Sequence, residues 1–309
     1  MELLVGAGGW LYFQVPGLKP LVAYSRAFNF VEVNSTFYKI PDLEVAELWR
    51  KMVSDDFVFS VRCHRDVTHK YMLRPVEEAL DALERMVEVC EVLNARYLVL
   101  QTPATLGFDA EEIGSARNLL ESVNLKRARL VWEIRKKPGK PVPKCVTALM
   151  QDLDIIHCMD ISKEAPLVQS DTVYTRVFGK GQRNIYQFSD EELAEIDSKI
   201  MSVNPRVAAV SFHNVRMYKD AARFRIYKET GKFPSVTGVE GKQSLRKVLM
   251  EDARFPATRE ELLKTQGWKV IDLVGDKRVH ASALLVRLPS ETFRSVEEVL
   301  AKLSLTSFY

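Results

Sequence analysis

Short apolar runs alternate with amphipathic stretches along most of this chain. Eight runs have β-strand composition, and apolar residues between them recur at helical spacing. The predicted strands are Leu3–Val5, Phe30–Val33, Phe57–Val61, Tyr97–Leu100, Leu130–Glu133, Ile155–Met159, Val173–Val177 and Ala208–Phe212. The predicted helices are Leu18–Phe28, Leu43–Met52, Val76–Leu93, Ala110–Ser122, Lys144–Met150, Asp190–Met201 and Asp220–Thr230.

This alternation predicts a parallel sheet closed into a (β/α)8 TIM barrel. A doubly wound open sheet is the competing fold. The short glycine-rich stretch Gly6–Gly9 after the first strand does not have the GxGxxG spacing of a dinucleotide-binding turn. The barrel is therefore favoured, and no nucleotide cofactor is expected.

The barrel is expected to be followed by a smaller domain. A turn-rich break, Thr230–Gly238, separates the last predicted barrel helix from the tail. In the tail, Thr258 and Ser295 each have a glutamate three residues on, as in helix capping boxes. We expect a barrel over residues 1–234 and a small, mainly helical C-terminal domain over residues 235–309.

Composition limits the function classes without choosing one. The chain has 309 residues, 47% hydrophobic residues and a net charge of +3, so bulk charge does not indicate nucleic-acid binding. No apolar run approaches the roughly 20 residues of a membrane span. The N-terminus lacks the basic start of a signal peptide, and the four cysteines are scattered. These features predict a cytoplasmic protein with no membrane association.

The segment Val31–Tyr38, VEVNSTFY, places many polar groups at the end of a predicted strand. Strand alternation sends Glu32, Asn34 and Thr36 to one side. Buried polar groups cost free energy unless they are hydrogen-bonded, so such a strand end indicates a polar network or a site.

The other predicted strands also end in polar residues. In a TIM barrel these ends meet at one mouth, where active sites are built. The candidate catalytic residues are Glu32, His69, Glu133, Asp160 and His213. The candidate substrate-binding residues are Trp10, Asn34, Thr36, Tyr38, Arg62, Thr68, Gln101, Arg135, Arg176, Gly179, Lys180 and Asn214.

Two interpretations of the acidic candidates remain open. The first is a divalent cation, Mg, Mn or Zn, held by oxygen-rich ligands that could activate water. Its candidate ligands are Glu32, Glu133, Asp160 and His213. The second is that the carboxylates pair with the nearby arginines Arg62, Arg135 and Arg176.

Phosphate binding is suggested by two further features. His69 has a side chain suited to a general base or a phosphate contact, with a structural loop contact as the alternative. The glycines of Gly179-Lys180-Gly181 follow the seventh strand, in a loop that often binds phosphate in this fold. The alternative for this loop is a solvated, flexible segment.

Several motifs resemble the DUF72 (YecE-like) family over about residues 3 to 230. They are Gly8-Gly9-Trp10, VEVNSTFY, Thr68-His69, Leu100-Gln101-Thr102-Pro103, Trp132-Glu133-Ile134-Arg135 and Ser211-Phe212-His213-Asn214. The resemblance implies a TIM barrel and carries no established activity. The chain departs from the family where Arg62-Cys63-His64-Arg65 replaces a Lys-Ala-Pro-Arg pattern and where Lys136 and Phe178 replace histidines. The tail weakly resembles DUF2795-type domains.

Three functions are consistent with these features. The first is an enzyme that hydrolyses or transfers a phosphoester of a small phosphorylated substrate or of nucleic acid. The second is a metal-free, glycosidase-like hydrolase that uses Glu32 and Glu133, and it fails if arginines cap both acids. The third is a non-catalytic module that binds nucleic acid or protein.

Overall fold

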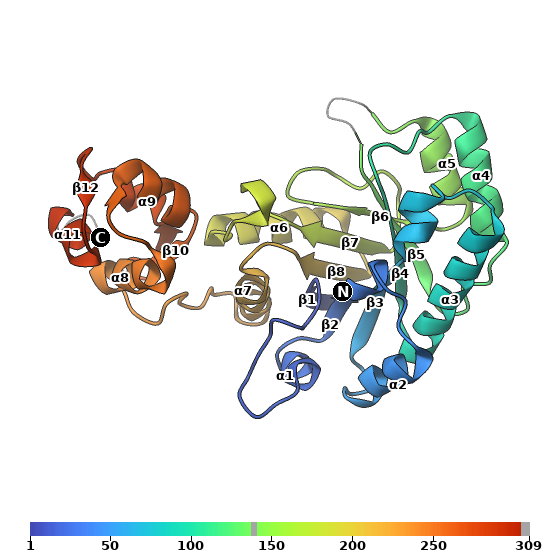
Figure 1. Cartoon of the computed structure of the whole chain (residues 1–309), viewed down its shortest axis with the longest axis horizontal. Helices are drawn as coiled ribbons and strands as arrows, with labels where there is room; N and C mark the ends of the chain where they lie inside the picture. The colour runs from blue at the N-terminus through green and yellow to red at the C-terminus, as the bar shows by residue number, and fades with distance from the viewer. Residues whose placement is uncertain (137–140, 304–309) are drawn as a thin grey trace. The chain divides into compact units, whose positions relative to one another are not determined.

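The computed structural model describes residues 1–136 and 141–303. Eight parallel strands close into a barrel in the order β1 to β8 (Figure 1). They are β1 (Glu2–Ala7), β2 (Phe30–Val33), β3 (Val58–Arg62), β4 (Tyr97–Thr102), β5 (Arg129–Ile134), β6 (Ile156–Met159), β7 (Thr172–Val177) and β8 (Val207–Phe212). Each of the eight predicted strands is present, which confirms the TIM barrel.

The helices also match the predicted pattern closely. They are α1 (Pro20–Ala27), α2 (Leu43–Lys51), α3 (Glu77–Leu93), α4 (Ala110–Glu121), α5 (Lys144–Asp152), α6 (Asp190–Val203) and α7 (Met217–Thr230). In α3, buried side chains such as Leu83, Met86 and Val87 recur at helical spacing, so one face packs inward. Asn94 ends α3 in a left-handed conformation, with φ of 49°.

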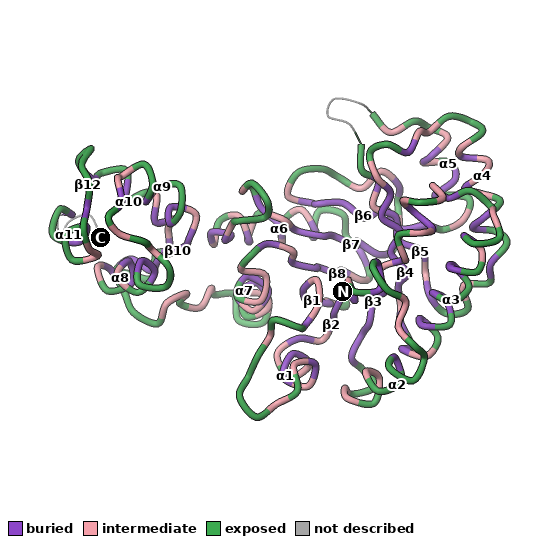
Figure 2. Tube along the Cα trace, in the orientation of Figure 1, coloured by how far each residue is buried: buried purple, intermediate pink, exposed green. Residues whose placement is uncertain are grey.

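The barrel core is apolar below the mouth. Interior side chains from alternate positions pack together, and Figure 2 shows the strands as largely buried. Phe30, Val99, Val131 and Tyr174 belong to this interior cluster. Trp132 alternates with Val131, and its indole N–H donates to the Thr102 hydroxyl at 3.0 Å.

Two short helical turns depart from the (β/α) repeat at the carboxyl ends of strands. After β2, residues Ser35–Phe37 form the 3-10 helix η1, and after β3, residues Asp66–Lys70 form the π-helical turn η2. A third, the 3-10 helix η3 (Gln182–Asn184), follows β7.

Between residues 241 and 303 the chain forms four helices and two small antiparallel sheets. Its elements are α8 (Gly241–Asp252), β9 (Ala257–Thr258), α9 (Arg259–Gln266), β10 (Val270–Asp272), β11 (Arg278–His280), α10 (Ser282–Leu285), β12 (Thr292–Phe293) and α11 (Val296–Lys302). Leu245, Leu249, Leu285 and Phe293 are among the side chains of its own core. The predicted C-terminal helices are thus present, and the capping box at Thr258 forms.

The chain divides into two compact units. The first comprises residues 1–177 and 198–212, and the second comprises residues 178–197 and the chain from residue 213 onward. The segment that follows β7 therefore groups with the C-terminal part. The expected boundary between residues 234 and 235 stays a prediction. In the part of the chain that the structure describes, no helix has the length and apolar character to cross a membrane.

Candidate functional site

The innermost layer of the site is a hydrogen-bonded chain inside the barrel. Glu32 on β2 is fully buried, and the Tyr174 hydroxyl donates to its Oε2 at 2.9 Å. The Ser60 hydroxyl lies 2.8 Å from the Tyr174 hydroxyl. Burial, and then the neighbouring Glu32 carboxylate, raises the pKa of Tyr174, so it stays a neutral donor. The predicted inward direction of Glu32 is confirmed.

Arg176 on β7 lies between two carboxylates. Its Nη2 is 3.1 Å from Oε1 of Glu32, and its Nη1 donates to Oε2 of Glu133 on β5. Its side chain is only 3% exposed. Burial alone would lower the pKa of Arg176, but the two carboxylates outweigh burial and raise it. The three side chains form a buried Glu–Arg–Glu triad.

This triad removes the glycosidase-like hypothesis. That mechanism needs two carboxylates facing a substrate, one as an acid and one as a base or nucleophile. Here one guanidinium caps both Glu32 and Glu133. The prediction that these acids work as a catalytic pair was therefore wrong, because Arg176 projects from β7 into the space between them.

Glu133 has both oxygens occupied. Oε1 accepts from Nε2 of Gln101 at 3.1 Å and from Nε of Arg135 at 3.2 Å, while Oε2 accepts from Arg176. Burial would raise the pKa of Glu133, but Arg176 and Arg135 lower it overall. Glu133 is thus a fixed, ionised acceptor that orients Gln101 and Arg135.

Arg62 on β3 extends this network toward the mouth. Its Nη2 donates to Oε1 of Gln101, and its guanidinium stacks 3.7 Å from the centroid of the Phe37 ring. Burial, and then Arg176, lowers the pKa of Arg62 to about 10, so it remains a cation at neutral pH. Its Nε is buried without a hydrogen-bond partner among the residues that the structure describes.

His69 lies among arginines. The Thr68 hydroxyl is 2.9 Å from Nδ1 of His69, and the imidazole meets the Phe37 ring edge-on at 4.9 Å. Burial, and then the positive charges of Arg62, Arg135 and Arg65, lowers the pKa of His69 below 6.5. The neutral form of His69 therefore predominates at pH 7.

The backbone around His69 is unusual. Thr68 and His69 lie on the π-helical turn η2, a conformation frequent at functional sites. Two left-handed residues follow, Met72 with φ of 52° and Leu73 with φ of 60°. The Leu73 amide donates to the Val67 carbonyl at 2.9 Å, which closes the turn. Left-handed conformations are costly for residues of this type, so packing must impose them.

The stretch after β2 departs from the predicted alternation. The strand ends at Val33 and η1 begins at Ser35, so Asn34 and Thr36 do not continue the face of Glu32. Thr36 is fully buried, and its hydroxyl is bonded to the backbone carbonyls of Val33 and Arg62. The alternation prediction was wrong for these residues because a helical turn replaces the strand.

Two predicted aromatic residues have different environments. Trp10 is only 7% exposed and packs edge-on against Trp49 at 5.2 Å and Phe59 at 6.4 Å, so it is a core contact. Tyr38 is 69% exposed and lines a shallow hollow of about 510 Å³ near η2, together with His64 and Tyr71.

Asp160 is held by the turn after β6. It accepts from the Ser162 amide and hydroxyl, and it pairs with Lys163 at 3.0 Å in the turn after β6. Among residues 1–136 and 141–303, no group of three or more His, Cys, Asp or Glu side chains is placed to hold a metal ion. The predicted ligand set of Glu32, Glu133, Asp160 and His213 is thus not assembled, since an arginine occupies the space between two of its members.

Four predicted site residues belong to the second unit and contact residues of that unit. The His213 ring lies 5.2 Å from the Phe178 ring, and Lys180 pairs with Glu192 at 2.7 Å. The buried Asn214 donates to Asp220 at 2.7 Å and to the Tyr186 carbonyl at 2.9 Å. Gly179, with φ of 82°, lies so close to the Tyr186 ring that a Cβ atom would meet it at 2.5 Å.

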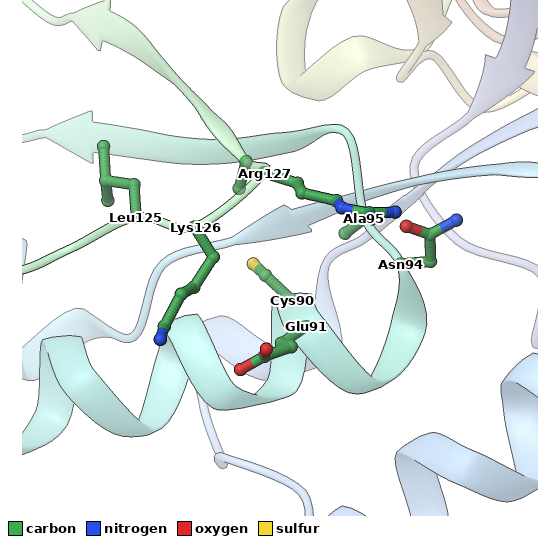
Figure 3. Close-up of a pocket in the computed structure, with 8 residues that line it drawn as sticks. Cys90, Glu91, Asn94, Ala95, Leu125, Lys126 and Arg127 are labelled. Atoms are coloured by element: carbon green, nitrogen blue, oxygen red, sulfur yellow. The ribbon is translucent and has the colours of Figure 1, made fainter.

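A separate cavity lies at the opposite end of the strands. It has a volume of about 390 Å³ and lies between the end of α3 and the turn before β5 (Figure 3). Its lining residues are Cys90, Glu91, Asn94, Ala95, Leu125, Lys126, Arg127 and Ala128. No predicted site residue lines it, and the amino-terminal face of this fold usually serves stability.

Sequence reasoning missed two members of the site, Tyr174 and Ser60, which join the buried chain. Arg65 adds to the positive charge around His69. Tyr174 precedes Arg176 by two positions on β7, so strand alternation could have indicated that both point inward. Nothing in the local sequence indicated that Arg65 acts on His69.

Comparison with known proteins identifies the family. A family model described as a protein of unknown function, DUF72, matches residues 5–227. The chain is 35% identical over 92 residues to the UPF0759 protein YecE of Escherichia coli K12. That match covers 29% of this chain and 33% of YecE, about a third of the length of that relative.

Solved structures agree in fold. The chain is similar to a DUF72 family protein from Thermotoga maritima MSB8, with a TM-score of 0.61 and 19% identity, over 74% of this chain and 100% of that one. It is also similar to a DUF72 family protein from Enterococcus faecalis V583, with a TM-score of 0.57 and 18% identity, over 74% and 98%. The resemblance of the tail to DUF2795-type domains stays a prediction, since the family match ends at residue 227. The chain belongs to the DUF72 family.

Proposed function

We propose that the barrel mouth binds a phosphorylated or other polyanionic substrate. The observation that carries this proposal is the grouping of His69 with arginines: the Arg62 guanidinium and the His69 ring both pack on Phe37, at 3.7 Å and 4.9 Å from its centroid. Burial, and then the charges of Arg62, Arg135 and Arg65, lowers the pKa of His69. Clustered guanidinium groups are suited to phosphate because they offer several donors and a fixed positive charge.

The charge balance of the network supports the same proposal. Three arginines, Arg62, Arg135 and Arg176, share only two carboxylates, Glu32 and Glu133. Arg176 is buried between the acids, whereas Arg135 is 52% exposed. The excess positive charge therefore falls on Arg62 and Arg135, beside His69.

The reaction we propose is hydrolysis or transfer of a phosphoester. Catalysis of phosphoryl transfer depends mainly on positioning and on stabilising charge on the phosphoryl oxygens. Arg62, Arg135 and His69 would supply that stabilisation as hydrogen-bond donors. The described His, Cys, Asp and Glu residues form no group that could hold a metal ion, so this stabilisation is assigned to the three side chains alone.

Binding is tested first. Calorimetry at pH 7.5 with inorganic pyrophosphate and a phosphate monoester should show binding to the wild-type chain. Arg135→Gln should weaken it by about tenfold, the loss of roughly one charged hydrogen bond. Arg127→Gln, at the opposite end of the barrel, is the matched control and should bind like wild type. No binding to the wild type would overturn the proposal.

Turnover is tested separately. A panel of phosphoesters is assayed with added Mg²⁺, Mn²⁺ or Zn²⁺ and with a chelator, using wild type and His69→Gln. Hydrolysis that His69→Gln reduces at least tenfold supports the enzyme. Binding without turnover of any panel member would leave the non-catalytic polyanion-binding alternative, for which affinity should fall steeply with salt.

A further inference from the structure

The hydroxyl of Thr68 has one polar neighbour in the described part of the chain. Thr68 is fully buried, and its Oγ1 lies 2.9 Å from Nδ1 of His69. Either atom could carry the shared proton. If Nδ1–H donated, the hydroxyl hydrogen of Thr68 would be buried without an acceptor, which costs about 1–3 kcal/mol. If the hydroxyl donates, only an oxygen lone pair is left unused.

We infer that the Thr68 hydroxyl donates to Nδ1 of His69 and fixes the neutral imidazole with its proton on Nε2. Nδ1 is then an occupied acceptor, and Nε2–H is the ring group left for a ligand. Thr68 is thus a positioning residue that sets which of two chemically different nitrogens His69 presents.

The charged groups around His69 are consistent with this assignment. The cations that act on the ring come from β3, from the loop after β5 and from the segment before η2, namely Arg62, Arg135 and Arg65. All of them disfavour a second proton on the imidazole. The ring is neutral, so its protonation pattern depends on the contact with Thr68.

The consequence is a set of three groups beside His69 that offers only donors. Arg62, Arg135 and Nε2–H of His69 can each give a hydrogen bond, and none can accept one. Such a set favours an oxyanion whose oxygens can all accept hydrogen bonds over one that carries a proton. Resting on the proposed function, this selects the dianion of a phosphate monoester over its monoanion. His69 serves as a hydrogen-bond donor to the anion and not as a general base.

The tautomer is measured by NMR. Long-range ¹H–¹⁵N spectra of the full-length chain at pH 7.5 separate protonated from unprotonated ring nitrogens, and His69→Gln assigns the signals. We expect a protonated Nε2 and an unprotonated Nδ1. Thr68→Val, which keeps the shape and removes the hydroxyl, should mix the two tautomers, and Thr68→Ser should restore the wild-type pattern. A protonated Nδ1 in the wild type overturns the inference.

Ligand selection gives a second readout. A phosphate monoester loses its second proton near pH 6, whereas sulfate is a dianion throughout. From pH 5.5 to 7.5 the affinity for the monoester relative to sulfate should rise by about threefold or more, following the dianion fraction. A constant ratio would overturn the donor-only site.

The outcomes separate the two proposals. A protonated Nε2 without any oxyanion binding would remove the proposed function and leave the role of Thr68 intact. Oxyanion binding with a protonated Nδ1 would support the proposed function and remove the role assigned to Thr68. Thermal melting of Thr68→Val and Thr68→Ser establishes that both variants are folded before either comparison.

Discussion

At the scale of single residues, the buried Arg176 decides what the two central carboxylates can do. Glu32 and Glu133 are both ion-paired to it, so neither faces a ligand as an independent acid. Their effect on the mouth is indirect. Glu133 orients Arg135 and Gln101, and Gln101 in turn orients Arg62.

Replacing Arg176 should destabilise the fold strongly. Arg176→Met leaves the buried Glu32 without its arginine and Glu133 with Arg135 alone, and we expect a loss of about 3–5 kcal/mol in the free energy of unfolding. Urea denaturation measures it. Arg96→Gln breaks the more exposed pair with Glu2 and should cost less than about 1 kcal/mol. Equal effects of the two changes would contradict the triad.

The pKa of His69 should respond to Arg135. The positive charge of Arg135 contributes to lowering that pKa below 6.5. Arg135→Gln should therefore raise the midpoint of the His69 titration toward 6.5, and Arg127→Gln should leave it in place. NMR titration from pH 4.5 to 8 without phosphate follows both variants. An unchanged midpoint in Arg135→Gln would show that the two side chains do not interact.

At the scale of elements, the π-helical turn η2 and the two left-handed residues after it position Thr68 and His69. This geometry is imposed by its surroundings, since neither Met72 nor Leu73 favours a positive φ. The turn is therefore a place where the chain accepts local strain next to the candidate site.

Glycine at Met72 should relieve that strain. Met72→Gly is expected to raise the free energy of unfolding by up to about 1 kcal/mol. Met72→Val should lower it by about 1 kcal/mol or more. Met52 is the matched control, because it has φ of −83° at the end of α2 and glycine there should destabilise. Thermal unfolding compares the wild type with these three variants. Equal shifts in melting temperature for Met52→Gly and Met72→Gly would contradict backbone strain at Met72.

Strand and helix positions could be predicted because the barrel repeats one apolar pattern. The ends of β2 and β5 were also correctly expected to carry inward polar groups, as Glu32 and Glu133 do. The helical turn after Val33 was not predicted, because the alternation of Val31, Glu32 and Val33 was extended through Asn34 and Thr36. The bridging position of Arg176 could not be predicted either, because the sequence gives no distances between side chains on β2, β5 and β7.

At the scale of the whole molecule, the segment after β7 is tied to the C-terminal part by specific bonds. Nε2 of His280 lies 2.8 Å from the Gln187 carbonyl, and the Val270 amide donates to Oε1 of Gln187 at 2.9 Å. Arg278 donates to Asp190 at 2.5 Å, at the first residue of α6. Residues 187–190 are thus held by β10 and β11 within one unit.

Loss of Arg278 should loosen this segment. In Arg278→Met, amide hydrogen exchange of residues 187–192 should become at least tenfold faster, because Asp190 loses one of its two arginine partners. Arg246→Met removes a more exposed ion pair with Glu297 and should leave amide exchange of residues 187–192 unchanged. Protection that persists in Arg278→Met would show that β11 does not hold the start of α6.

The pairing of β1 has a consequence for how the chain folds during synthesis. All six residues of β1 are in register with β8, from Glu2 with Val207 to Ala7 with Phe212, whereas only Gly6 and Ala7 are in register with β2. The Tyr24 hydroxyl bridges the β1–β2 seam, accepting from the Ala7 amide and donating to the Phe30 carbonyl. β1 thus completes its ladder only when β8 is available, so closure of the barrel requires translation through Phe212.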